Sequence, residues 1–150
     1  MNKTEAQISV RGLTVAYGDF VLLKNADFDI NKGDVFIIMG ASGGGKSSLL
    51  RVLTGLVPAA SGRILIDGVD FTAATENERA KIMQKCGILY QSGALFSSMT
   101  LAENIALPLR QYTDYSDKLI SELVSLKLAL VGLTGFEEFY PSEISGGMKK

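Results

Sequence analysis

The stretch Gly40-Ala41-Ser42-Gly43-Gly44-Gly45-Lys46-Ser47 decides the fold of this chain. It matches the pattern G-x-x-x-x-G-K-[ST] at every fixed position and holds four glycines. The continuous apolar run Val35–Met39 precedes it and predicts a strand buried on both faces. Residues 46–54 follow with leucines at helical spacing, and Gly55 is placed to end that helix. A strand, a glycine loop and a helix in this order predict an α/β fold with a phosphate-binding (Walker A) loop.

The residue types in this loop suit a triphosphate. Glycines let the backbone adopt positive φ and bring successive N–H groups close to phosphate oxygens. The helix that begins near Lys46 adds unpaired N–H groups and the positive end of its dipole. Lys46 supplies a cation for the β- and γ-phosphates, and Ser47 supplies a hydroxyl for Mg²⁺. The alternative is a glycine-rich turn without a ligand, and the register of the glycines with Lys46 and Ser47 argues against it.

The bulk composition is that of an ordinary globular chain. Of the 150 residues, 47% are hydrophobic and 21% are charged, and 15 basic residues oppose 16 acidic ones. The net charge of −1 gives no electrostatic argument for nucleic acid, although Lys149 and Lys150 could begin a local basic patch. The single cysteine, Cys86, predicts a reducing compartment and is expected to be structural.

The start of the chain lacks the apolar stretch of a signal peptide. No apolar run approaches the ~20 residues that span a bilayer. We therefore expect a cytoplasmic protein that reaches a membrane only by docking to a partner that spans it.

Period and turn signals predict strands first and helices later. Strands are expected over residues 7–15, 20–23, 26–30, 35–39, 63–66 and 86–90. Helices are expected over residues 46–54, 77–84, 100–107 and 116–131. Thr100 with Glu103 forms a capping-box pattern, and Pro108 should bend or stop that helix. Residues 144–148 are interpreted as a loop that opens another helix.

Further motifs resemble those of the ATP-binding cassette (ABC) ATPases. Ser142–Lys150 resembles the family's signature, usually written L-S-G-G-Q, with Met148 at the position of Gln. Tyr90-Gln91-Ser92 resembles the Q-loop, and Tyr17 resembles the aromatic residue that stacks on adenine. The segments 53–56, 61–62 and 66–68 also match the family pattern, so the resemblance covers nearly the whole chain.

The resemblance implies a fold and a division of the chain. The fold is an incomplete P-loop NTPase of ABC type, with an N-terminal antiparallel β-subdomain and P-loop core followed by a helical subdomain. Residues 1–91 would form the core part up to the Q-loop, and residues 92–150 the helical subdomain that ends at the signature.

The resemblance also implies the site residues. Tyr17 would stack on adenine, and Gln91 would reach Mg²⁺ and the attacking water; the plainer alternatives are a surface tyrosine and a loop glutamine. Lys46 and Gln91 would be the catalytic residues, and Ser47 and Gln91 the metal ligands. The remaining nucleotide contacts would come from Gly40, Ala41, Ser42, Gly43, Gly44, Gly45, Lys46, Ser47 and Ser48, and, on the ATP of a second subunit in a head-to-tail dimer, from Ser145, Gly146, Gly147 and Met148.

A finer resemblance concerns cargo. Gln91–Phe96, Met99-Thr100 and Glu103–Leu109 look like the ATPases of lipid-asymmetry (Mla- or Mkl-type) transporters. These move phospholipid between inner and outer membranes with a permease, expected to dock near residues 92–109, and an MCE-domain lipid-binding partner. The alternatives are another transport cargo, a nucleotide-binding fragment without ATPase activity, or an ABC protein of translation or DNA repair. The lack of a basic excess counts against the last.

The family's later motifs are not present in these 150 residues. A Walker B strand, a D-loop and a switch histidine would follow the signature, and the chain contains no histidine. We therefore expect negligible ATP hydrolysis by these residues alone. We also expect a gap in the central sheet that deprives Phe36, Ile38 and Ile88 of partners. A partial sequence and a natural short paralogue are both open explanations.

Overall fold

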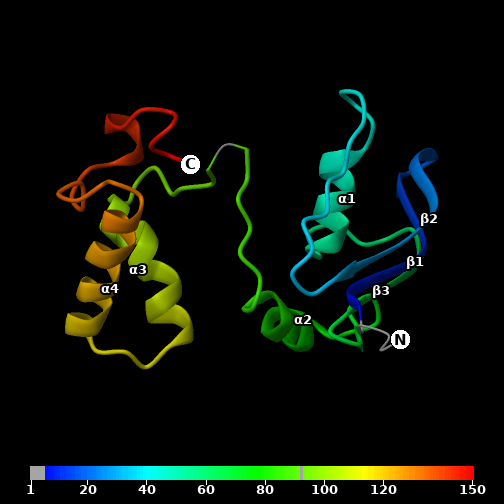
Figure 1. Cartoon of the computed structure of the whole chain (residues 1–150), viewed down its shortest axis with the longest axis horizontal. Helices are drawn as coiled ribbons and strands as arrows, with labels where there is room; N and C mark the ends of the chain where they lie inside the picture. The colour runs from blue at the N-terminus through cyan, green and yellow to red at the C-terminus, as the bar shows by residue number, and fades with distance from the viewer. Residues whose placement is uncertain (1–5, 92) are drawn as a thin grey trace. The chain divides into compact units, whose positions relative to one another are not determined.

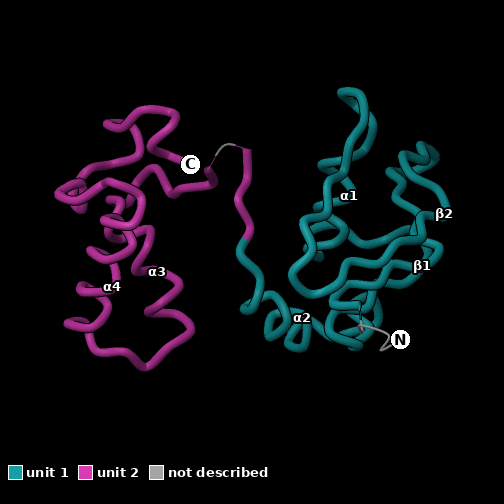
Figure 2. The backbone as a smooth tube through the Cα atoms, viewed as in Figure 1, with its two compact units in different colours: residues 1–87 teal, residues 88–150 magenta. Residues whose placement is uncertain are grey.

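The computed structural model describes residues 6–91 and 93–150. The chain forms two compact units, residues 1–87 and residues 88–150 (Figure 2). The first contains the sheet and the phosphate-binding loop, and the second contains a pair of helices and the signature. Gln91 lies in the second unit.

The first unit is built on a four-stranded antiparallel sheet of order β2-β1-β3-β4 (Figure 1). The strands are β1 (Ala6–Tyr17), β2 (Phe20–Asn31), β3 (Ser61–Ile66) and β4 (Val69–Asp70). The two strands expected over 20–23 and 26–30 are one strand, β2. Asn25 has a φ of 51° where the β1–β2 register shifts, so a bulge bends the strand without ending it.

The core of this unit lies between the sheet and helix α1 (Lys46–Leu53). Val10, Leu13 and Val15 of β1 are each no more than 1% exposed. Val10 and Leu13 are both buried although they are three residues apart, because the strand register shifts between them. Leu49 and Val52 of α1 belong to the same buried core. Of the leucines expected to share one face, Leu49 is buried and Leu53 packs at the margin of the core, whereas Leu50 is exposed. Helix α2 (Glu76–Met83) adds Ile82 and Met83 at the margin of the same core. This packing fixes α1, and therefore the loop before it, to the sheet.

The strands expected over 35–39 and 86–90 are wrong, because both stretches are irregular in the structure. Val35 is 89% exposed, Met39 84% and Leu89 67%. No described strand lies against either stretch to pair its backbone N–H and C=O groups, so neither joins the sheet. Of the residues expected to lose partners, Phe36 stacks on Phe28 with ring centroids 5.1 Å apart, and Ile38 packs at the margin of the core.

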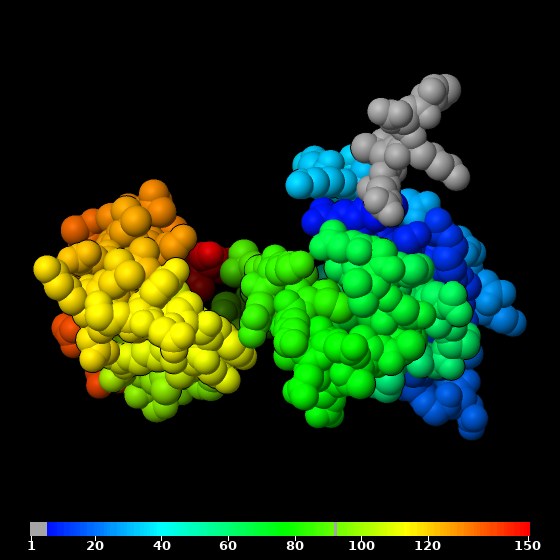
Figure 3. Space-filling model, turned by 90° about the horizontal axis from the view of Figure 1, so that it is seen from below, coloured from blue at the N-terminus to red at the C-terminus, as the bar shows by residue number. Residues whose placement is uncertain are grey.

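The second unit is a helical hairpin of α3 (Leu101–Tyr112) and α4 (Asp117–Leu130), followed by a loop and a 3₁₀ turn, η1 (Pro141–Glu143). The end of α3, the turn after it and the start of α4 form the yellow surface seen in Figure 3. The buried core of this unit comprises Leu101, Ala106, Ile120, Val124, Leu128, Leu133 and Ile144. Of the two outcomes expected at Pro108, a bend or a stop, the stop is wrong, because α3 continues to Tyr112. Leu109 packs on the core just beyond Pro108, and this packing offsets the lost backbone hydrogen bond.

Candidate functional site

The phosphate-binding loop, Gly40–Ser47, turns back on itself before α1 begins. The Gly44 N–H donates to the Ala41 carbonyl across 3.1 Å and closes the turn. Gly45 has a φ of 79° and precedes the first residue of α1. A Cβ at Gly45 would lie 3.4 Å from the Leu22 Cβ on β2, so the loop also passes close to the sheet here. Only glycine adopts this backbone readily, which explains the glycine at this position in physical terms.

Helix α1 begins without a capping side chain among the described residues, and its first turn holds no acidic residue. Its first N–H groups are therefore open to an external acceptor. The other three α-helices of the described residues are capped by their own side chains: Thr75 for α2, Thr100 for α3 and Ser116 for α4. An open helix start after a glycine loop is the arrangement that binds phosphate.

Lys46 lies over the loop that precedes it. Its Nζ donates to the carbonyl oxygens of Gly40 and Ala41 at 2.7 and 2.6 Å. The ammonium group thus lies against the first two residues of the phosphate-binding loop. A charge-assisted pair of bonds at these lengths holds the side chain without a carboxylate partner, which leaves its charge available to an anion.

Tyr17 and Ser48 lie together at the first turn of α1. Tyr17 is the last residue of β1 and is 43% exposed. Its hydroxyl is 3.5 Å from the Ser48 Oγ, at the outer limit of a hydrogen bond. The structure therefore brings Tyr17 to the first turn of α1, and its stacking on adenine stays a prediction. Ser47 is exposed at the same helix start.

The described residues hold no cluster of three or more His, Cys, Asp or Glu side chains that could bind a metal ion. A Mg²⁺ ion at this loop would therefore depend on the Ser47 hydroxyl together with phosphate oxygens and water. Mg²⁺ commonly binds in this way, keeping several waters and few protein ligands. The loop residues fit such an ion only when a phosphate brings it.

The signature forms a single helical turn in the second unit, which we call the signature turn (Ser145–Lys150). The Ser145 Oγ accepts from the Met148 N–H at 3.3 Å, and the Ser145 carbonyl accepts from the Lys149 N–H at 3.2 Å. Ser145 is thus an N-cap. The helix expected to open here is present only as this turn. Ser145, Gly146 and Gly147 are exposed, whereas Met148 is half-buried against the core.

The model of the ABC transporter family matches residues 23–150. This chain belongs to the ABC transporter family. The match includes the phosphate-binding loop, Gln91 and the signature turn, and it begins after Tyr17.

Relatives of this ABC transporter chain include proteins named Mkl and proteins named MlaF. It is 44% identical to the probable ribonucleotide transport ATP-binding protein Mkl of Mycobacterium leprae, over 95% of this chain and 41% of that protein. It is 39% identical to the intermembrane phospholipid transport system ATP-binding protein MlaF of Haemophilus influenzae, over 95% of this chain and 54% of that protein. MlaF of Escherichia coli is 35% identical, with 53% of its length covered. The chain spans about half the length of the curated relatives it matches.

Solved ABC cassettes have the same fold. A dimeric, post-hydrolysis structure of the ATP-binding cassette MJ0796 bound to ADP and Pi matches with a TM-score of 0.86 and 28% identity. The match covers 95% of this chain and 65% of that chain. CbiO1 from Clostridium perfringens, part of the transporter complex cbiONQ, matches with a TM-score of 0.80 and 25% identity, over 97% of this chain and 58% of that chain. The ABC type of P-loop fold expected from the sequence is confirmed.

None of the helices in the described part of this ABC transporter chain is long and apolar enough to cross a membrane.

Gln91 is exposed and lies in the second unit with the signature turn, and Ser92 lies outside the described residues. Each unit therefore carries part of the predicted ABC site. The first holds Tyr17 and the phosphate-binding loop, and the second holds Gln91 and the signature turn. The catalytic role of Gln91 and Lys46 stays a prediction, as do the contacts of Ser145–Met148 with the nucleotide of a second subunit.

Asn104 is a residue that the motifs of this ABC transporter chain did not single out for a role. Its Oδ1 accepts from the Phe96 N–H at 2.8 Å. Its Nδ2 donates to the carbonyls of Phe96, Met99 and Thr100 at 2.9 to 3.2 Å. One amide on α3 thus fixes the loop that follows Gln91. The sequence did show an asparagine one helical turn after the predicted N-cap Thr100. The spacing of the residues did not reveal which backbone groups its side chain would bind.

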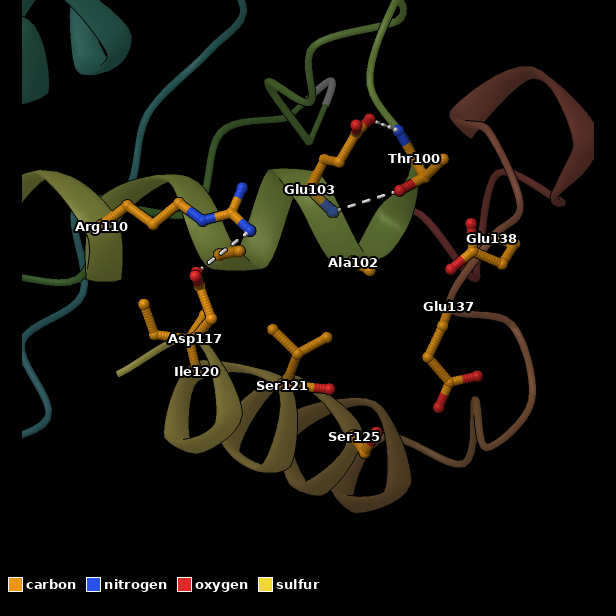
Figure 4. Close-up of a pocket in the computed structure, with 12 residues that line it drawn as sticks. Thr100, Ala102, Glu103, Arg110, Asp117, Ile120, Ser121, Ser125, Glu137 and Glu138 are labelled. Carbon is orange, nitrogen blue, oxygen red and sulfur yellow. Dashed lines mark hydrogen bonds and ion pairs between the residues drawn. The ribbon is translucent and has the colours of Figure 1, made fainter. Parts of the chain in front are cut away.

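A cavity of about 320 Å³ lies between α3 and α4 (Figure 4). Arg110 on α3 and Asp117 on α4 form an ion pair of 3.8 Å at one end. Glu103, Glu137 and Glu138 also line the cavity. Because carboxylates outnumber the one guanidinium, the cavity disfavours a polyphosphate. This cavity is therefore a poor candidate for the nucleotide site.

Proposed function

We propose that this chain is the nucleotide-binding part of the ATPase that energises an ABC transporter, and that it binds Mg·ATP at the phosphate-binding loop. The observation that carries the proposal is the open start of α1, with the Lys46 ammonium beside it. A triphosphate supplies the acceptors that these N–H groups lack, and it supplies the negative charge that pairs with the Lys46 ammonium.

Binding of the triphosphate would change the partners of Lys46. Its Nζ would leave the carbonyls of Gly40 and Ala41 for the β- and γ-phosphates, which offer charged acceptors in place of neutral ones. The exposed Ser47 hydroxyl would join the coordination of Mg²⁺. Tyr17, held at the first turn of α1, would stack on the adenine ring.

A second subunit would complete the site. In this proposal the signature turn presents the Ser145 hydroxyl and the N–H groups of Gly146 and Gly147 to ATP on the other copy. Their exposure supports this role, since nothing in their own unit covers them among the described residues. Gln91 would contact Mg²⁺ and the attacking water. The solved cassette MJ0796 is dimeric, which supports a head-to-tail pair here.

We propose phospholipid as the cargo, moved between bacterial inner and outer membranes. The named function of the MlaF relatives supports it. A permease docked near residues 92–109 and an MCE-domain lipid-binding protein would be the partners, with the ATPase on the cytoplasmic face of the inner membrane. A second candidate cargo is ribonucleotide, because the Mkl relatives carry that name at 43–44% identity.

Nucleotide binding is tested by isothermal titration of the chain with Mg·ATP, Mg·ADP and AMP. We expect ATP and ADP to bind and AMP to bind at least tenfold more weakly, because the α1 start and Lys46 address phosphates beyond the first. Absence of ATP binding, or equal binding of AMP, would contradict the proposal.

The cargo is tested in the host cell by removing the protein that contains this chain and restoring it with or without Lys46→Ala. Phospholipid should accumulate in the outer leaflet of the outer membrane, and only the unmodified protein should reverse this. Normal phospholipid distribution together with reduced ribonucleotide uptake would favour the second candidate instead.

A further inference from the structure

Gly93 and Lys149 touch within the second unit, although they lie far apart in the sequence. Gly93 has a φ of 80°. A Cβ built on it would lie 2.6 Å from the Lys149 carbonyl oxygen and 3.7 Å from the Lys149 Cβ. The first distance is too short for any real Cβ contact, so a side chain at Gly93 would force the Lys149 backbone to move. Glycine is therefore required here by a neighbouring segment as well as by its own backbone angle.

On one side of the contact lies the turn that carries Gln91. The Gly93 N–H donates to the Tyr90 carbonyl at 3.0 Å and closes this turn, which we call the Gln91 turn (Tyr90–Gly93). Beyond it, Asn104 holds Phe96 through hydrogen bonds to both its N–H and its carbonyl. Gly93 thus sits between the predicted catalytic glutamine and a loop that is fixed to α3.

On the other side of the contact lies the signature turn. The Lys149 N–H donates to the Ser145 carbonyl, so Lys149 closes the backbone turn that Ser145 opens. Met148, the preceding residue, packs against the core of the second unit. A displacement of the Lys149 backbone would therefore be transmitted directly to the hydrogen bond that defines the start of the signature turn.

Other glycines of the unit show that this contact is specific. Gly132 and Gly135 also have positive φ, 75° and 86°, but a Cβ on either would meet nothing within 4 Å. They serve their own turns after α4. Gly93 differs because its missing side chain is the space that the Lys149 carbonyl occupies.

We propose that Gly93 is a positioning residue that joins the Gln91 turn to the signature turn, so that the two predicted nucleotide-contacting segments of this unit keep one fixed spacing. The effect of this spacing on ATP-dependent association rests on the proposed function, in which Gln91 contacts the chain's own nucleotide and Ser145 contacts the nucleotide of a second copy. The contact itself is independent of that function and is tested separately.

The matched pair of variants is Gly93→Ala and Gly135→Ala. Both place a methyl group on a backbone of positive φ, but only the first meets the Lys149 carbonyl. Amide hydrogen exchange of Lys149 and Lys150, whose N–H groups donate to Ser145 and Gly147, should be at least ~10-fold faster in Gly93→Ala and unchanged in Gly135→Ala. Equal exchange in the two variants would overturn the inference.

The functional readout separates positioning from loss of folding. Affinity of the single subunit for ADP without Mg²⁺ should be the same in both variants, because the phosphate-binding loop belongs to the other unit and Gln91 is proposed to act only on Mg²⁺ and the attacking water. ATP-dependent association of two copies, measured by sedimentation, should weaken by ~10-fold or more only in Gly93→Ala. Unchanged association would overturn the positioning role, as would an unmodified chain that binds ATP and does not associate.

Two further outcomes distinguish a failure of the proposed function from a failure of the Gly93 inference. If the unmodified chain binds no Mg·ATP, the proposed function fails and the exchange experiment alone decides whether Gly93 positions the signature turn. If Gly93→Ala does not fold, NMR of the unmodified chain tests the contact instead, through nuclear Overhauser effects between the Gly93 Hα and Lys149 protons. Their presence supports the inference, and their absence overturns it.

Discussion

Helices α1 and α3 begin in opposite ways. At α3, the Thr100 hydroxyl accepts from the Glu103 N–H, the Glu103 carboxylate accepts from the Thr100 N–H, and Asn104 ties down the preceding loop. At α1, Gly45 offers no side chain, and Lys46 turns back onto loop carbonyls. Every helix leaves its first N–H groups without intrahelical partners. At α3, the chain's own side chains accept hydrogen bonds from these N–H groups. At α1, the N–H groups remain open to a ligand.

The difference separates stability from function in the same molecule. The α3 start is 8% exposed at Thr100, belongs to the core of its unit and should affect folding when it is changed. At the α1 start, Ser47 is exposed and Lys46 is half-buried, and Lys46 is a cation without a carboxylate partner among the described residues, so changes there should affect binding first. The following predictions test this division.

The largest effect is expected from Lys46→Ala. Loss of the ammonium should weaken Mg·ATP binding by about 100-fold, or about 2.7 kcal/mol, because hydrogen bonds to charged groups contribute about 1.5–3 kcal/mol each. Thermal unfolding should change little, since Lys46 bonds only to loop carbonyls. Isothermal titration and a melting curve measure the two quantities.

The matched control for that change is Lys32→Ala, which removes the same charge from an exposed turn of the same unit. It should leave Mg·ATP affinity within about twofold. If both variants lose affinity equally, net charge rather than the loop geometry accounts for binding. The conclusion that the α1 start serves binding would then be wrong.

The next effect is expected from Asn104→Ala, and it should fall on stability. The change leaves the Phe96 N–H and several carbonyls without their partner, at a cost of about 1–3 kcal/mol in the free energy of unfolding of the second unit. Urea denaturation followed by signals of that unit measures it. Gln111→Ala, an exposed position on the same helix, is the control and should cost much less. Equal losses at both positions would contradict a role for Asn104 in fixing the loop.

A smaller loss is expected from Thr100→Ala, which removes the N-cap of α3. Such caps contribute about 1 kcal/mol to stability, and Thr100→Ser should recover most of it because serine offers the same hydroxyl. Mg·ATP affinity should not change in either variant. A variant that folds normally but binds ATP poorly would show that the two helix starts are not as independent as their geometry indicates.

Local sequence patterns correctly predicted strands whose hydrogen-bonding partner is the next strand along the chain. Alternation identified β1, which pairs with β2 next to it in the chain and buries Val10 and Leu13. The apolar run Val35–Met39 has a stronger strand signal than β1, yet it is irregular and largely exposed. An apolar run reports that its residues favour burial. It does not report whether a neighbouring strand is available to pair its backbone.

The same limit applies to the site. The phosphate-binding loop could be predicted because its glycines, Lys46 and the helix start are consecutive residues. For Tyr17, only the family resemblance implied a place at the nucleotide site. Its hydroxyl lies beside Ser48 in the structure. The contact of Gly93 with Lys149 and the bonds of Asn104 join segments whose approach depends on how α3 and α4 pack. Spacing alone contains no information on such contacts.

The smallest effect concerns acid and the capped start of α2. The Thr75 backbone N–H, and then its hydroxyl, donate to the Glu78 carboxylate at 2.8 and 2.7 Å, and these bonds lower the pKa of Glu78. A carboxyl with a lowered folded pKa stabilises the fold above its unfolded pKa, and that contribution is lost as the pH falls through the folded value. Acid should therefore loosen the start of α2 and leave that of α1, which has no acidic residue in its first turn, unaffected. A carboxyl-detected NMR titration should place Glu78 below the ordinary glutamate value, and Thr75→Ala should move it part of the way back, because the backbone donor remains. A midpoint for Glu78 at the ordinary value in the unmodified chain would show that its capping bonds do not persist in solution, and would remove α2 from the set of internally satisfied helix starts.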